Sequence, residues 1–135
     1  MLQAAAESND LKAVVSEGAG SRSVREVVEK KAWLDVPTYS VITAGTALFS
    51  NQAPPPNLKN LVGRIAPRPV FFIYSTHGVG GEEKQLNPKY YAAAGEPKQS
   101  WEIPEASHTG GIVARPKEYE QRVIGFFDRA LLGTG

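Results

Sequence analysis

Three segments of the chain, the first two rich in apolar and β-branched residues, predict β-strands. Residues 11–16 form a short β-branched run that ends in the turn signal Gly18-Ala19-Gly20. Residues 70–74 are continuously bulky and apolar, which is typical of a central strand covered on both faces. Residues 99–103 form a third run, which Pro104 ends.

Helical patterns lie between these runs. An Ala-rich segment predicts a short helix at residues 2–8. The spacing of Ser23 and Glu26 matches a capping box, and the helix that it opens is expected to reach about Leu34. Residues 38–49 are apolar nearly all round with little charge, which is typical of a helix that is buried or that lines a pocket or an interface.

Proline and glycine mark the remaining helix boundaries. Residues 57–62 are predicted to form one or two helical turns, and a helix is expected to start at Asn87-Pro88 and run through Ala94. Pro116 suits the first position of the last helix, and Gly133 suits its end. Because strands alternate with helices, the chain is predicted to be an α/β domain with three parallel strands flanked by helices.

The carboxyl ends of the predicted strands carry the candidate chemistry, because sites in open parallel sheets collect there. The loop at residues 75–83 holds His77, Glu82 and Glu83, and the loop at residues 105–111 holds His108. A carboxylate after one strand and a histidine after the next match the second half of a nucleophile–acid–histidine triad. The carboxylate holds the imidazole in one tautomer so that it acts as a general base. Without this pairing, the two histidines are simply surface groups.

Composition narrows the classes of function. There are 15 basic and 14 acidic residues, a net charge of +1 that argues against a nucleic-acid partner. The chain has no cysteine, so disulfides, thiolate nucleophiles and cysteine-ligated zinc are excluded. No stretch has the length of a membrane span, and the first ten residues do not form a signal peptide. We therefore expect a cytoplasmic protein with no membrane partner.

Four segments resemble the C-terminal part of an α/β-hydrolase, of the kind grouped with dienelactone hydrolases and acyl-CoA thioesterase-like enzymes. They are residues 13–20, the proline-rich entry and strand at 65–74, Gly-Gly-Glu at 80–82, and residues 103–111 around His108. The resemblance covers essentially the whole chain as one domain, 1–135. It implies that the three strands are the last three of an eight-stranded sheet and that residues 21–64 are a lid-like helical insertion.

The same resemblance implies a function and its residues. His108 would be the catalytic histidine and Glu82 or Glu83 the acid, in a serine mechanism that hydrolyses an ester, thioester or lactone. No cofactor and no metal are implied. A metal site formed by His77, Glu82, Glu83 and His108 is a weaker alternative, because the spacing is not that of a zinc helix.

The sequence departs from the resemblance at the nucleophile. The elbow motif G-x-S-x-G is absent, so the nucleophile is expected in a missing N-terminal half, and stand-alone activity is doubtful. Ser16, Ser21 and Ser75 are the candidates for a substitute nucleophile. A competing hypothesis is a non-catalytic fragment or a self-associating module. In particular, an unpaired strand edge at residues 13–15 predicts a homodimer.

Overall fold

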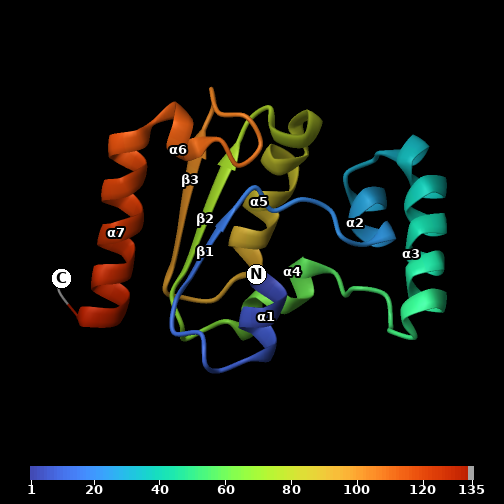
Figure 1. Ribbon diagram of the computed structural model, residues 1–135, viewed down its shortest axis with the longest axis horizontal. Coiled ribbons are helices and arrows are strands. Elements are labelled where there is room, and N and C mark those ends of the chain that lie inside the picture. Colours follow the sequence, from blue (N-terminus) through green and yellow to red (C-terminus); the bar gives the residue numbers. More distant parts are fainter. Residues whose placement is uncertain (134–135) are drawn as a thin grey trace.

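Residues 1–133, the part of the chain that the computed structural model describes, form one three-stranded parallel sheet (Figure 1). Its strands are β1 (Val14–Glu17), β2 (Val70–Ser75) and β3 (Lys98–Ile103), in the spatial order β1-β2-β3. In the register, Val70 lies opposite both Val14 and Lys98, so all three strands end at the same edge. The predicted α/β class with three parallel strands is confirmed.

Helices cover both faces of this sheet. They are α1 (Leu2–Glu7), α2 (Val24–Glu29), α3 (Val36–Ser50), α4 (Leu58–Leu61), α5 (Glu82–Ala93), α6 (Gly111–Ala114) and α7 (Pro116–Leu132), with 3-10 turns at Trp33–Asp35, Val62–Arg64 and Gly78–Gly81. Figure 1 shows α7 on one face, α1, α4 and α5 on the other, and α2 and α3 beyond that second layer. Within residues 1–133, no helix is long and apolar enough to cross a membrane.

Strand β2 lies between two hydrophobic cores. Val70 and Phe72 belong to the core shared with α1, α4 and α5, whereas Phe71 and Ile73 belong to the core on the α7 side. Phe126 of α7 packs against Phe71 with a ring-centroid separation of 5.6 Å. Because alternate side chains of a strand point to opposite faces, the apolar run of β2 serves both cores.

The first strand and the capped helix differ from the predictions in length. Strand β1 begins at Val14, later than predicted. The capping box of Ser23 and Glu26 is present, but α2 ends at Glu29 and not near Leu34. Lys31 adopts a left-handed conformation with φ of 60°, and the amide of Ala32 bonds back to the Val27 carbonyl. This left-handed closure ends the helix.

Two further helices differ from the predictions. Helix α5 starts at Glu82, so Pro88 lies inside it and does not open it. Acidic residues in a first turn are favourable next to the positive end of the helix dipole, which accounts for the earlier start. The apolar helix α3 has no buried residue, so of the environments expected for it burial in the core is wrong, whereas lining a pocket is met at Tyr39.

Candidate active site

Glu83 and His108 meet at the carboxyl edge of the sheet. Glu83 lies in the first turn of α5, after β2, and His108 lies in the loop after β3. His108 Nδ1 is 2.6 Å from Glu83 Oε1, and the Glu83 side chain is fully buried while that of His108 is 51% exposed. A buried carboxylate bonded to one ring nitrogen fixes the tautomer and leaves the other nitrogen available. The predicted hydrogen bond between His108 and a carboxylate at 82 or 83 is therefore confirmed.

The Glu83 carboxylate is itself held by the end of β2. Its Oε2 accepts hydrogen bonds from the Ser75 amide at 2.9 Å and from the Ser75 hydroxyl at 3.2 Å. The Ser75 hydroxyl also accepts a bond of 2.7 Å from the Gly78 amide. A side chain at Gly78 has no room, because a Cβ atom there would lie 2.0 Å from Glu83 Oε1. The position of the carboxylate thus depends on Ser75 and on the absence of a side chain at 78.

The His108 side chain packs against the backbone that follows β1. Gly18 has φ of +68°, and a Cβ atom there would lie 2.9 Å from the imidazole Cε1 and Nδ1. Its neighbour Glu17 accepts hydrogen bonds of 2.8 Å from the Gly111 amide and from the Tyr119 hydroxyl. These bonds hold the end of the loop that carries His108 against β1. Burial, together with the bond to Glu17, raises the pKa of Tyr119 to about 12. Residues 17 and 18 therefore form the base against which the histidine loop packs.

Glu82 faces a different partner from Glu83. Its Oε2 lies 2.5 Å from Lys30 Nζ in a buried ion pair, and its Oε1 accepts a hydrogen bond from the Ser21 amide. Burial alone would raise the pKa of Glu82, but the bonds from Lys30 and Ser21 outweigh it and lower that pKa. Of the two carboxylates that the sequence left open, Glu83 bonds to His108. Glu82 instead joins α5 to Ser21 before α2 and to Lys30 at the C-terminal end of α2.

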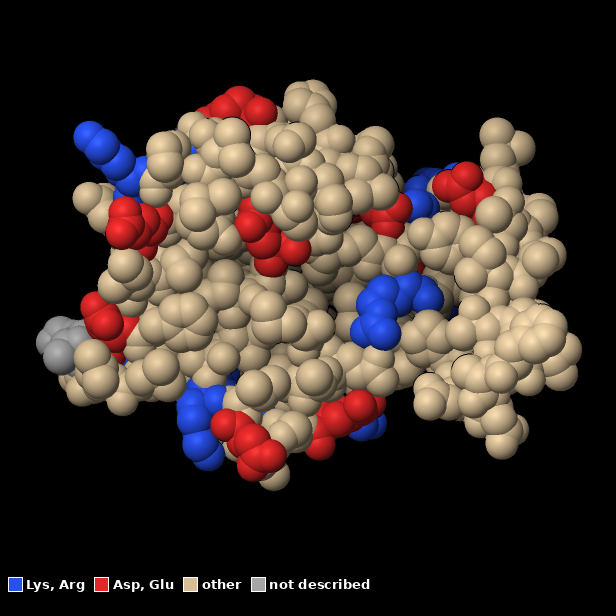
Figure 2. Space-filling model, viewed as in Figure 1, with Lys and Arg blue, Asp and Glu red and all other residues tan. Residues whose placement is uncertain are grey.

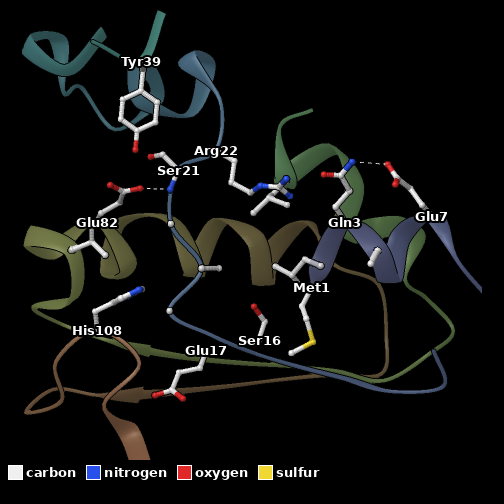
Figure 3. A pocket seen from close by; sticks show the side chains of 17 residues that line it. Met1, Gln3, Glu7, Ser16, Glu17, Ser21, Arg22, Tyr39, Glu82 and His108 are labelled. Carbon is white, nitrogen blue, oxygen red and sulfur yellow. Dashed lines mark hydrogen bonds between the residues drawn. The ribbon is translucent and has the colours of Figure 1, made fainter. Parts of the chain in front are cut away.

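An open cavity of about 820 Å³ lies beside His108. Figure 3 shows His108, Ser16, Ser21 and Glu82 around it, with α1 on the opposite side. The imidazole projects into the cavity with a ring nitrogen at its tip. The cavity thus adjoins the candidate base at the edge where ligands of parallel sheets bind.

The other candidate residues are not joined to this pair. Within residues 1–133, no serine hydroxyl forms a hydrogen bond to His108. The hydroxyl of Ser75 is occupied by Glu83, and Ser16 lines the cavity from the end of β1. His77 is exposed on its loop. Among the described residues, no group of three or more potential ligands is placed to hold a metal ion.

Sequence reasoning missed the residues that support the pair. Ser75 was considered only as a nucleophile and Gly18 only as part of a turn, and no supporting role was predicted for Gly78. Glu17 was not singled out. The one available signal was the placement of small residues at the ends of β1 and β2, where a second group must approach the backbone closely.

The three parallel strands and their flanking helices form part of an α/β-hydrolase fold. Solved structures agree in fold. The α/β-hydrolase GrgF of Penicillium sp. sh18 matches 97% of this chain and 60% of its own, with a TM-score of 0.59 and 16% identity. The esterase Pf2001 of Pyrococcus furiosus matches 96% of this chain and 48% of its own, with a TM-score of 0.63 and 17% identity. The chain therefore spans about half of these proteins, consistent with the C-terminal part of the fold.

One curated relative also shows sequence similarity. The uncharacterized protein PA2218 of Pseudomonas aeruginosa is 34% identical over 70 residues, which are 52% of this chain and 18% of that protein. Its crystal structure matches 96% of this chain and 57% of its own, with a TM-score of 0.52 and 20% identity. No known protein-family profile matches the sequence.

Proposed function

We propose that this chain carries the acid–histidine half of a serine hydrolase site that cleaves an ester, thioester or lactone. The observation that carries the proposal is the 2.6 Å contact between His108 Nδ1 and the buried Glu83, beside an open cavity. The fold shared with hydrolases and esterases supports the same reaction class.

His108 has the general-base and general-acid role. While its Nδ1–H group donates a hydrogen bond to Glu83, the imidazole accepts a proton at Nε2 from an attacking hydroxyl group. The Glu83 carboxylate stabilises the imidazolium that forms, and His108 then gives the proton to the leaving alcohol or thiol. Ser75 and Gly78 keep the carboxylate in place throughout these steps.

The nucleophile of the proposed site lies outside these 135 residues. The sequence contains no G-x-S-x-G, and the chain spans only 60% of GrgF and 48% of Pf2001. Met1 and Leu2 of the α1 region line the same cavity as His108, so a segment joined ahead of them would start beside it. A preceding strand on the free side of β1 would extend the sheet, since β1 is the last strand at that edge.

The proposal predicts that the chain alone is not an efficient esterase. A histidine–carboxylate pair acting on water gives about 10²–10⁴-fold assistance, and the larger electrostatic stabilisation by an oxyanion hole is missing. We expect intact-mass analysis to find no adduct of a fluorophosphonate probe on any serine. Stoichiometric labelling of Ser16, Ser21 or Ser75 would contradict an external nucleophile.

A two-piece experiment tests the function directly. The chain is mixed with a separately expressed segment of the same reading frame that carries an elbow motif, and hydrolysis of a p-nitrophenyl ester is followed. We expect activity that disappears in His108→Ala and falls about 10⁴-fold in Glu83→Gln. His77→Ala is the matched control, since it removes the other histidine, which is exposed on its loop, and leaves the pair intact. A folded complex without hydrolysis would favour a non-catalytic fragment.

A further inference from the structure

Helix α3 presents its bulky apolar side chains to solvent. Val41, Ile42, Leu48 and Phe49 are 72%, 60%, 78% and 90% exposed. Together with Gly45 they recur at the spacing of a single helical face. Figure 1 shows α3 on the outer side of α2, far from the sheet. We call this surface of Val41, Ile42, Gly45, Leu48 and Phe49 the α3 face.

The opposite side of the helix contacts the protein. Tyr39, Thr43 and Ala47 are half-buried, and Tyr39 lines the cavity beside His108. These three positions are spaced by four residues and lie on the other side of α3 from its outward face. The α3 face therefore points away from the cavity, and a substrate bound there would not contact it.

Together with the two residues before the helix, the α3 face exposes more apolar area than an isolated monomer normally shows. Trp33 and Leu34, just before the helix, add two side chains that are 63% and 95% exposed. At ~150–250 Å² for a fully exposed large apolar side chain, the α3 face exposes roughly 500 Å², and Trp33 and Leu34 before it add roughly 300 Å². The largest apolar patch of a typical monomer covers about 300–600 Å². A stable interface buries about 800 Å² on each partner, so the area suits one protein–protein contact.

The absence of charged residues from α3 indicates what kind of partner covers the α3 face. Residues 36–50 contain no Lys, Arg, Asp or Glu, and Figure 2 shows the projection over α3 without charged groups. Helices that lie on membranes carry basic residues on their polar side, which α3 lacks. A heterologous partner is commonly selected by complementary charge, which is also absent here. A charge-free face is complementary to itself, because two copies bring no like charges together.

We propose that the α3 face binds the α3 face of a second copy of this chain in a two-fold symmetric dimer. An antiparallel pair of helices places Val41 and Ile42 against Leu48 and Phe49 of the second copy. Gly45 then lies near the symmetry axis, where a Cβ atom would have no neighbour within 4 Å in the single chain. This surface is separate from the free edge of β1 and does not depend on the proposed hydrolase function.

The oligomeric state of the 135-residue chain tests the proposal. Size exclusion with light scattering is expected to give twice the chain mass of 14.6 kDa at tens of micromolar. The double variant Ile42→Glu, Phe49→Glu is expected to run at the mass of one chain with an unchanged circular dichroism spectrum. Val113→Glu is the matched control, since Val113 is 83% exposed on α6 and should leave the dimer intact.

A cross-linking arm locates the contact. The chain has no cysteine, so Gly45→Cys is expected to form an intermolecular disulfide under mild oxidation, whereas Val113→Cys is not. A monomeric parent at 100 μM, including one that sediments with neutral lipid vesicles, would overturn the proposal. So would a dimer that survives the double glutamate variant, because association would then use another surface such as the β1 edge.

Discussion

Adding one methyl group at Gly78 is expected to displace the acid of the candidate site. In Gly78→Ala, the new Cβ atom would lie 2.0 Å from Glu83 Oε1, 2.3 Å from its Cδ and 2.3 Å from Ser75 Oγ. Contacts this short cannot persist, and both side chains are buried. Glu83 must therefore shift, and its 2.6 Å bond to His108 is broken.

The expected loss of folding stability in Gly78→Ala has two contributions. Overpacking a filled interior costs about 1–3 kcal/mol. The lost bond to His108 contributes only a little, because that side chain is half exposed. We expect a destabilisation of about 2 kcal/mol, which lowers the melting temperature by roughly 6–8 °C in a chain of this size.

Two measurements check this prediction. Calorimetry gives the melting temperature, and proton NMR follows the downfield resonance of the His108 Nδ1 proton, which should disappear. Gly125→Ala is the matched control, because its Cβ atom would meet only the flexible end of Arg129 inside α7. It should be neutral or stabilising by up to about 1 kcal/mol. A Gly78→Ala chain with the parent's melting temperature and an unchanged Nδ1 resonance would refute the packing argument.

Three further predictions concern the contacts around the site. Lys30→Met leaves the buried Glu82 without its partner and should cost about 3 kcal/mol in urea unfolding. Because the pKa of Glu82 is lowered in the folded chain, the ion pair stabilises the fold above the usual pKa near 4.5, and this contribution is lost as the pH falls through the lowered value. Acid titration of Lys30→Met should show a weaker pH dependence in that range. Tyr119 has a raised pKa of about 12, so its contribution is complete below pH 10 and lost as the pH approaches 12. Absorbance titration should find this tyrosine at lower pH in Glu17→Ala, and an unchanged curve would disprove the contact. Ser23→Ala removes the side chain that caps α2 and should cost about 1 kcal/mol by thermal unfolding, whereas Ser100→Ala on the exposed part of β3 should not.

Local patterns in the sequence were enough to predict the three strands, most of the helices and the fold class. The apolar run at β2, the capping box of α2 and the proline that opens α7 each depend on residues close together in the chain. Parallel strands end at one edge, so the loops after β2 and β3 had to lie together. His108 and a nearby carboxylate could therefore be named from the sequence alone.

The tertiary structure decided which carboxylate bonds to His108 and which face of α3 contacts the rest of the protein. Glu82 and Glu83 are adjacent in α5, and successive helical residues point about 100° apart, so only one of them reaches His108. That choice depends on Lys30 and Ser75, which lie on different elements. For α3, apolar residues occur nearly all round the helix, so periodicity did not select an inner face. The inner face is the one that carries Tyr39, which lines the cavity. Ile42 and Phe49 lie on the other side of the helix and are exposed to solvent, because no residue among 1–133 covers them.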